Sequence, residues 1–379
     1  MFKLTNSKVK KALVVDDSAF MRKLISDFLN SHPGIEVIGV ARDGKDAVEK
    51  VKTLKPDVVT LDVEMPLMNG LEALKEIMEV HPVPVVMLSS TTKEGAENTI
   101  LAMEYGAVDF VAKPGGAISL NLHDVKDEII EKVAAASGVQ ISKLRRISPR
   151  IGEKVTSIQQ KRTFQPKESI GEINPSKSIQ IKKFSKTSKT IVVIGTSTGG
   201  PRALQEVLTK LPKDFQAPIL IVQHMPPGFT KSLADRLDGI CEIGVKEAED
   251  GDLLKNGTAY IAPGGKHLKV KKLGTSYFAK LDAIELPRLG HRPSVDVLLE
   301  SAAELVGVKY LTVIMTGMGN DGRDGIERLN ETCETITIAE SSETSVVYGM
   351  PKAVVEAKLA DGIVKLTDIS KTMIEILKS

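Results

Sequence analysis

The sequence has little of several features that would point to special classes of protein. It contains no Trp and only two cysteines, Cys241 and Cys333, which stand far apart and form no C-x-x-C spacing. A disulfide framework or a cysteine metal site is therefore not expected. No run approaches the roughly 20 apolar residues that a membrane helix needs, and the N-terminus lacks the apolar core of a signal peptide. We expect a cytoplasmic protein without membrane insertion.

The positive charge of the chain is concentrated in one segment. The formal net charge is only +2, but the stretch from Lys143 to Thr190 holds 13 Lys or Arg and 3 Glu, so the remainder is acidic. A nucleic-acid patch has this charge signature. We prefer a solvated linker without a nucleic acid partner, because no stacking aromatics or recognition helix accompany the charge.

Strand and helix patterns alternate on both sides of the basic segment. Short apolar runs separated by amphipathic stretches predict an α/β fold with a five-stranded parallel sheet before it. The second block predicts a doubly wound α/β domain with a mainly parallel sheet, and its Gly-rich region at 257–286 suggests hairpins. The predicted organisation is a first domain, a linker with one short helix near 139–147, and a second domain, at residues 1–136, 137–189 and 190–379.

Five polar side chains follow strands of the first predicted sheet. Asp16 and Asp17 follow the first strand, Asp62 ends the third, and Ser89 and Lys113 follow the fourth and fifth. In a parallel sheet these positions share the carboxyl edge. Clustered carboxylates repel each other, which a hard divalent cation such as Mg²⁺ relieves, and a carboxylate can also accept a phosphoryl group. Any one Asp alone fits a helix cap equally well, but together they predict a site.

These five residues, with Pro114 after the lysine, resemble the receiver domain of bacterial two-component response regulators over residues 10–120. The resemblance implies a flavodoxin-like fold, a histidine kinase as phosphoryl donor and Asp62 as the phosphoacceptor. It implies that Mg²⁺ is bound by Asp16, Asp17, Asp62 and the backbone carbonyl of Glu64.

The resemblance also implies a conformational switch at Ser89, Phe110 and Lys113. Many receivers carry Thr and Tyr where this chain has Ser89 and Phe110. The serine keeps the hydroxyl, whereas the phenyl ring cannot make a hydroxyl contact.

A Gly/Ser/Thr turn opens the second block. The residues at 195–199, Gly-Thr-Ser-Thr-Gly, follow a buried strand pattern and precede a helix pattern, as in the G-x-S-x-G turn. Such a turn lifts Ser197 above the sheet, beside the free N–H groups of a helix N-terminus. By itself the turn fits a phosphate-binding loop or an ordinary connection equally well, although the Gly-Lys-Ser/Thr ending of a P-loop is missing.

A serine nucleophile needs a base and a carboxylate that orients the base. Among six histidines, His224 directly follows the strand at 219–223, and Asp321 follows the strand at 311–315 through a short turn. Both positions lie at the carboxyl edge, so Ser197, His224 and Asp321 make a plausible triad. The less specific alternative for Asp321 is the N-cap of the next helix.

The turns IGTSTGGP, QHMPPGFT and TGMGNDG, with RPSVD at 292–296, resemble the catalytic domain of chemotaxis protein-glutamate methylesterases from about residue 190 to the end. The resemblance implies that Ser197, His224 and Asp321 are the triad and that the N–H groups of Thr198 and Met318 form the oxyanion hole. It implies hydrolysis of glutamate methyl esters on chemoreceptors, with deamidation of receptor glutamines, and no cofactor for that reaction. It further implies a receiver that covers the catalytic cleft until phosphorylation, and we expect a monomer.

Two alternatives stay open. A transcriptional response regulator would need a recognition helix after the linker, and a non-catalytic protein-binding output domain would need a degenerate serine site. His267 and His291 have no assigned role. His291 and Arg292 would either line the substrate groove or stand beside a helix cap at Ser294.

Overall fold

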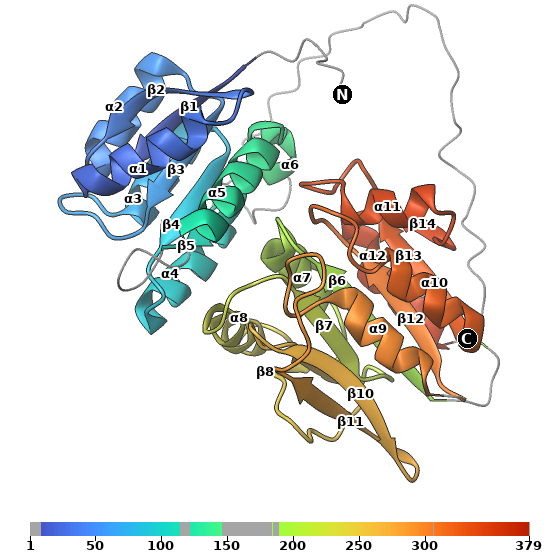
Figure 1. Ribbon diagram of the computed structural model, residues 1–379. Helices are drawn as coiled ribbons and strands as arrows, with labels where there is room; N and C mark the ends of the chain where they lie inside the picture. Colours follow the sequence, from blue (N-terminus) through green and yellow to red (C-terminus); the bar gives the residue numbers. More distant parts are fainter. Residues whose placement is uncertain (1–8, 114–121, 146–183, 185–188, 306, 379) are drawn as a thin grey trace, which may run out of the picture.

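The computed structural model describes residues 9–113, 122–145, 184, 189–305 and 307–378. Two α/β units are visible in Figure 1, one drawn in blue to green and the other in yellow-green to red. Most of the predicted linker, residues 146–183 and 185–188, lies outside the described residues, as does Pro114. Among the described helices, none has the length and apolar character needed to cross a membrane.

The first unit is a five-stranded parallel sheet in the order β2-β1-β3-β4-β5. Strands β3 and β4 are buried along their whole length, so they read as continuous apolar runs. The elements are β1 (Lys10–Val15), α1 (Ala19–Asn30), β2 (Ile35–Ala41), α2 (Gly44–Leu54), β3 (Val58–Asp62), α3 (Gly70–Val80), β4 (Val85–Ser89), α4 (Lys93–Glu104), β5 (Asp109–Ala112), α5 (Leu122–Ser137) and α6 (Ile141–Arg145).

Several helices of this unit begin at N-cap residues that the sequence supplies. Ser18, Asp43 and Thr92 each accept a backbone N–H of the first helical turn, and Asn69 forms a capping box with Glu72. The sheet is covered on one face by α1 and α5 and on the other by α2, α3 and α4. The predicted doubly wound receiver fold is confirmed.

The second unit is a seven-stranded parallel sheet in the order β14-β13-β12-β6-β7-β9-β8. Its strands are β6 (Thr190–Thr196), β7 (Ile219–Gln223), β8 (Gly244–Glu247), β9 (Thr258–Ile261), β12 (Lys309–Ile314), β13 (Glu334–Glu340) and β14 (Gly362–Val364). The helices are α7 (Gly200–Leu208), α8 (Phe229–Asp238), α9 (Val295–Ala303), α10 (Arg323–Thr332), α11 (Met350–Glu356) and α12 (Leu366–Lys378).

The Gly-rich region contributes an antiparallel hairpin, β10 (His267–Leu273) with β11 (Ser276–Asp282), as predicted. The hairpin projects from the bottom of the molecule in Figure 1. Strand β9 in the same region joins the main parallel sheet instead of forming a hairpin. The apolar cluster that contains the hairpin side chains also includes those of α9, α10 and α11, so these elements share one face of the sheet.

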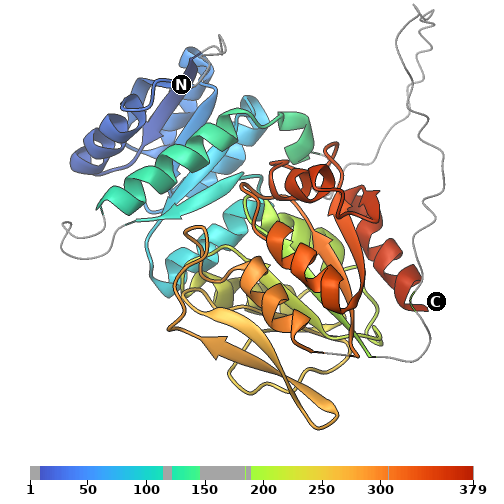
Figure 2. The ribbon, with the colours of Figure 1, turned by 45° about the vertical axis from the view of Figure 1, so that its right-hand side comes forward.

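The two units pack directly against each other through α4, α5 and α6 of the first. One apolar cluster continues from α4 and β5 into α7 and α8, and Figures 1 and 2 both show α4 beside α8. The first sheet is therefore placed with its β5 edge toward the carboxyl edge of the second.

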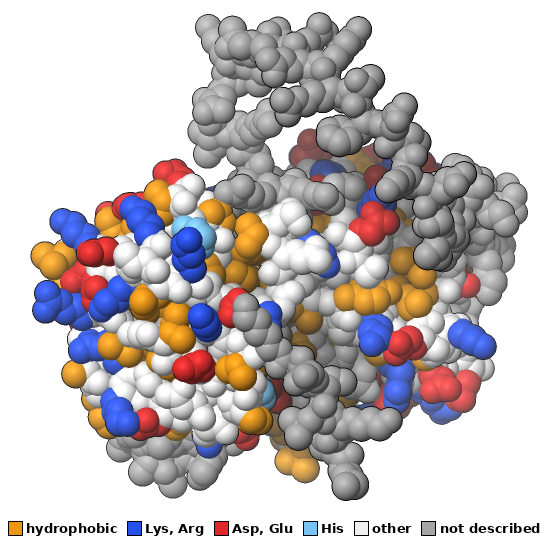
Figure 3. Space-filling model, turned by 90° about the horizontal axis from the view of Figure 1, so that it is seen from above, with side chains coloured by type: hydrophobic (Ala, Val, Ile, Leu, Met, Phe, Trp, Pro, Cys, Tyr) orange, Lys and Arg blue, Asp and Glu red, His pale blue; other side chains and the backbone are white. Residues whose placement is uncertain are grey.

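On the top face, acidic and basic side chains are interspersed rather than separated (Figure 3).

Candidate active site

The predicted acidic pocket of the receiver assembles at the ends of β1, β3 and β5. Ligand atoms of Asp16, Asp17 and Asp62 lie within 4.8 Å of one another. The Lys113 ammonium group lies 2.8 Å from Asp16 Oδ2 and 2.7 Å from Asp62 Oδ2. Asp16 and Asp62 are buried and Asp17 is exposed, so the pocket opens to solvent on the Asp17 side.

The electrostatics of this pocket suit a cation and a phosphoryl group. Burial raises the pKa of Asp62 to about 6, and the charge of Asp16 adds to this effect, against the opposing influence of Lys113. An all-oxygen set of three carboxylates is the donor set that Mg²⁺ prefers, so the residues fit the ion. Glu64, the fourth expected ligand, donates its own N–H to Asp62 Oδ1 at 3.3 Å.

Two of the predicted switch residues are buried: Ser89 ends β4 at the same edge as the acidic pocket, and Phe110 lies near the start of β5. The Ser89 hydroxyl is buried and donates to the Gly95 carbonyl at 3.0 Å. Phe110 is also buried, and its ring stacks on Phe229 of the second unit with centroids 4.5 Å apart. An apolar ring at this position is therefore explained by its place in the interface between the two units.

The turn after β6 presents Ser197. Its N–H donates to the Thr316 carbonyl at 3.0 Å, which ties the turn to the loop after β12. Gly199 has φ +78°, a conformation that glycine adopts without strain. At Gly317 a Cβ would lie only 2.8 Å from Ser197 Cβ, so glycine is needed for the two turns to approach.

The predicted base and carboxylate meet. His224 Nε2 lies 2.8 Å from Asp321 Oδ2, and both side chains are buried. The Asp321 carboxylate also accepts from Ser294 Oγ at 2.8 Å and from the N–H groups of Val295 and Asp296 at 2.7 and 3.0 Å. Asp321 thus binds the N-terminus of α9, whereas the N-cap residue of α10 is Gly322.

These contacts decide the charge state of the pair. Burial acts to raise the pKa of Asp321, but the hydrogen bond and charge of His224 and the α9 N–H groups hold it well below its usual range. The carboxylate is therefore charged and fixed against the ring. Because Nε2 faces Asp321, the other ring nitrogen, Nδ1, is the one left for a reacting hydroxyl; it is buried and has no partner among the described residues.

Ser197 and His224 line one cleft of about 530 Å³, together with Met318 and the segment from Leu289 to Pro293. The structure records no hydrogen bond between Ser197 Oγ and His224 within the described chain. Helix α5 of the receiver lines this cleft with Asp127, Glu128, Glu131 and Lys132. The serine and the base are thus neighbours in a cleft that the receiver partly covers.

The backbone donors expected at the oxyanion hole lie on the two adjoining turns. The described residues provide no acceptor for the N–H of Thr198 or of Met318. The Thr198 side chain is engaged by the receiver, because its hydroxyl donates to Asp109 Oδ2. The N–H groups are therefore free while the side chain beside them is held.

Two contributors to the site were not predicted from the sequence. Gln223 accepts a hydrogen bond from the Thr196 hydroxyl at 2.7 Å and donates one to the Ser197 carbonyl at 3.0 Å, so it supports the serine turn. Asp296, within RPSVD, accepts from the N–H groups of Gly322 and Gly325 at 2.9 and 2.7 Å. Its burial and the nearby Asp321 charge raise the pKa of Asp296 to about 7. The QHMPPGFT and RPSVD turns contain both residues, but their roles depend on tertiary contacts.

His291 takes a clear place in the site. Its ring lies flat against His224, with centroids 3.9 Å apart and planes 9° from parallel. Burial lowers the pKa of His291 to about 4, and the charge of His224 adds to the effect. Ser294 is indeed the N-cap of α9, accepting from Val297 N at 3.4 Å. His267 is buried in β10, where Nε2 lies 3.1 Å from the Leu286 carbonyl.

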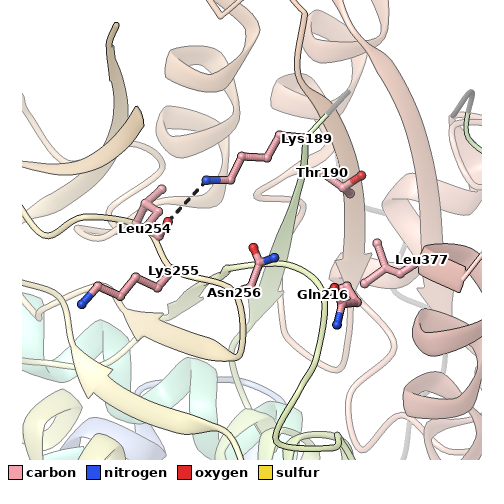
Figure 4. A pocket seen from close by; sticks show the side chains of 7 residues that line it. All are labelled: Lys189, Thr190, Gln216, Leu254, Lys255, Asn256 and Leu377. Carbon is pink, nitrogen blue, oxygen red and sulfur yellow. Dashed lines mark hydrogen bonds between the residues drawn. The ribbon is translucent and has the colours of Figure 1, made fainter. Parts of the chain in front are cut away.

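A second open hollow of about 560 Å³ lies at the other end of the sheet, near the starts of β6 and β7 (Figure 4). It is lined by Lys189, Thr190, Gln216, Leu254, Lys255, Asn256 and Leu377. The Lys189 ammonium group reaches the Leu254 carbonyl only at 3.5 Å. The lining residues of this hollow include no pair like His224 and Asp321.

A receiver sheet joined to a second parallel sheet that carries a Ser, His and Asp cluster defines a response regulator with a hydrolase-type output domain. Residues 12–122 match the family model of the response regulator receiver domain, and residues 192–373 match that of the CheB methylesterase.

Relatives match this chain over nearly its whole length. A protein-glutamate methylesterase/protein-glutamine glutaminase of Geobacillus kaustophilus is 55% identical over 98% of this chain and 99% of its own length. One from Halalkalibacterium halodurans is 53% identical over 97% and 98%. A crystal structure of the Thermotoga maritima CheB methylesterase catalytic domain matches 50% of this chain and 100% of its own, with 48% identity and a TM-score of 0.48. The chain belongs to the family of the protein-glutamate methylesterase/protein-glutamine glutaminases.

Proposed function

We propose that this protein removes methyl groups from glutamate side chains of chemoreceptors, releasing methanol, and deamidates receptor glutamines, under the control of receiver phosphorylation. The observation that carries the proposal is the fixed His224–Asp321 pair in one cleft with Ser197. The names of the relatives supply the substrate class. A non-catalytic output domain would have no need of a buried, charged carboxylate behind an imidazole.

In the proposed reaction Ser197 Oγ attacks the ester carbonyl carbon while His224 Nδ1 takes its proton. Asp321 holds the tautomer with a proton on Nε2 and stabilises the imidazolium that forms. The tetrahedral intermediate collapses with breakage of the bond to the methoxy group, which leaves as methanol with the proton from Nδ1. Water then attacks the acyl-enzyme by the same route and releases the glutamate carboxylate. With an amide substrate the leaving group is ammonia.

The oxyanion of each intermediate needs two donors. The N–H groups of Thr198 and Met318 belong to turns that are held together by the Ser197 N–H to Thr316 carbonyl bond. Two preset donors of this kind typically contribute about 3 kcal/mol each to transition-state stabilisation. Gln223, by fixing the Ser197 carbonyl, acts as a positioning residue for the same turn.

The receiver supplies the control. Asp62 would accept the phosphoryl group, with Mg²⁺ held by Asp16, Asp17, Asp62 and the Glu64 carbonyl. The ion would neutralise the charge that develops on the phosphoryl oxygens. In the arrangement described here α5 lines the catalytic cleft and Asp109 holds Thr198. Phosphorylation has to favour a looser arrangement to raise activity.

The test is methanol release from methylated receptor by wild-type protein and by Ser197→Ala. We expect the variant to lose release entirely while Asp62 phosphorylation stays intact. Methanol release by Ser197→Ala near the wild-type rate would overturn the assignment of the nucleophile.

A further inference from the structure

The receiver packs beside two arginines on the catalytic unit, of which Arg202 is buried and Arg236 is exposed. Arg236 of α8 forms two hydrogen bonds with the Glu104 carboxylate of α4, at 2.7 and 2.9 Å. Arg202 of α7 lies beside this pair, and both arginines line the same small cavity between α4, α7 and α8. Glu104 therefore satisfies one of two neighbouring guanidinium groups.

Arg202 is left without an acceptor. Its side chain is only 7% exposed, and its Nη1 and Nη2 are buried without a hydrogen-bond partner among the described residues. The cavity measures about 10 Å³, which has room for about one water molecule. Glu206, four residues further along α7, pairs with Lys210. Burial lowers the pKa of Arg202 to about 10, which still leaves it charged near neutral pH.

A buried and unpaired guanidinium group lowers the stability of the arrangement that contains it. Arginines are found in such positions where they meet a planar carboxylate in a two-bonded geometry. Arg202 stands five residues after Ser197, in the first turn of the helix that the serine turn begins. A carboxylate bound there would lie at the start of the helix that follows Ser197.

We propose that Arg202 and Arg236 form a docking site for carboxylates of the protein substrate, and that Glu104 of the receiver occupies half of it in the closed arrangement. The inference rests on the proposed function and names its recognition element. The partner is an acidic segment of the receptor, because each hydrolysed ester or amide leaves a glutamate carboxylate on it. Leu233 and Leu237 line the same cavity and offer apolar contact to such a segment.

This site explains how the receiver competes with the substrate at a distance from Ser197. While the receiver is in place, Arg202 is buried and the exposed Arg236 already donates two hydrogen bonds to Glu104, so neither guanidinium is free to bind an acidic segment. Departure of the receiver frees both arginines at once, so the charge that is costly in the closed arrangement becomes a binding group in the open one. Binding should therefore weaken as salt rises.

The experiment measures methanol release against receptor concentration, using the full chain with Mg²⁺ and a small phosphoryl donor. The variants are Arg202→Gln and Arg236→Gln. The matched control is Arg328→Gln, because Arg328 is an exposed arginine of α10 paired with Glu331. We expect each docking variant to raise KM for the receptor about tenfold, as for loss of a charge-paired contact, with kcat within twofold and the control unchanged. Arg202→Lys should recover part of the loss.

Two further measurements keep the outcomes distinct. Hydrolysis of a small neutral ester, p-nitrophenyl acetate, should be the same in wild-type and Arg202→Gln protein, since it bears no carboxylate to dock. Unchanged KM for the receptor in both variants would overturn the docking site while leaving the esterase intact. If the variants changed methanol release only in the absence of the phosphoryl donor, that result would also overturn the docking site, because Arg202 would then act only on the closed arrangement. Absence of methanol release by the wild type would instead overturn the proposed function.

Discussion

The hydroxyl of Thr198, the residue after the proposed nucleophile Ser197, donates a hydrogen bond to Asp109 of the receiver. Asp109 opens β5, the strand that also carries Phe110, and its other carboxylate oxygen accepts the Phe110 N–H at 2.8 Å. The strand that ends at the phosphoryl-accepting pocket thus touches the proposed oxyanion turn directly. A shift of β5 on phosphorylation would therefore be transmitted to the active site through the Asp109–Thr198 hydrogen bond.

Asp109→Ala should raise methanol release in the absence of a phosphoryl donor by several-fold, because it removes a buried contact that exists only in the closed arrangement. The measurement is the initial rate on methylated receptor before and after addition of donor. Asp27→Ala is the control, since Asp27 is an exposed residue of α1 paired with Lys23. An unchanged basal rate in Asp109→Ala would show that this hydrogen bond does not hold the closed arrangement.

His291 is expected to position His224 by stacking rather than by proton transfer. His291→Phe keeps a flat ring and should retain kcat within about threefold, whereas His291→Ala should lower it about tenfold by leaving the base less ordered. The measurement is kcat for both variants from pH 5 to 9. Loss of activity in His291→Phe equal to that in His291→Ala would assign His291 a chemical role.

The same residue gives a pH dependence of stability. Its pKa is near 4 in the folded chain against an ordinary 6.5, so the unfolded chain binds the proton first as the pH falls. The charges that face it are those of His224, Asp321 and Lys132. The stability that the neutral ring contributes is present above pH 6.5 and lost toward pH 4. Thermal unfolding of His291→Phe should show a smaller loss over this window than the wild type.

Glu340 gives a pH dependence of stability in the opposite direction. It is fully buried at the end of β13, and burial raises its pKa to about 7, although its carboxylate accepts the Thr316 N–H at 2.8 Å. A raised pKa means that the folded chain holds the proton more tightly, so this stability is present below pH 4.5 and lost as the pH rises through 7.

Glu340→Gln keeps an acceptor for Thr316 and removes the titration. The variant should gain about 2–3 kcal/mol relative to wild type between pH 5 and pH 9. Denaturant unfolding at the two pH values checks the sign. A difference between the two proteins that stays constant with pH would contradict the raised pKa.

Asp62→Asn should abolish phosphorylation and leave the enzyme at its basal rate whatever the donor concentration. It should also weaken Mg²⁺ binding, because one of three convergent carboxylates is lost. Mg²⁺ titration followed by thermal unfolding measures this separately from activity. Phosphorylation that persists in Asp62→Asn would place the acceptor elsewhere.

The sequence predicted those parts of the site that follow from strand order. Each of these residues, Asp62, His224 and Asp321, ends or follows an apolar run. Parallel strands bring such positions to the carboxyl edge of their own sheet, independently of the loop conformations. The sequence could not predict which nitrogen of His224 meets Asp321, since that depends on the direction from which the loop after β12 arrives.

Contacts between the units also escaped prediction. The Phe110–Phe229 stack and the unpaired Arg202 arise only when two separately folded sheets meet, and no periodicity within either encodes the match. Asp321 shows the same limit on a smaller scale. A cap for α10 was a reasonable alternative, but the carboxylate turns to the N-terminus of α9, a helix distant along the chain.

The most direct test of the central claim is methanol release from methylated receptor by the full chain, with and without a small phosphoryl donor and Mg²⁺. The account predicts slow release without the donor, a rise of at least several-fold with it, and no release in either condition from Ser197→Ala. Equal release by wild-type protein in the two conditions would contradict control by the receiver, and release by Ser197→Ala would contradict the serine mechanism.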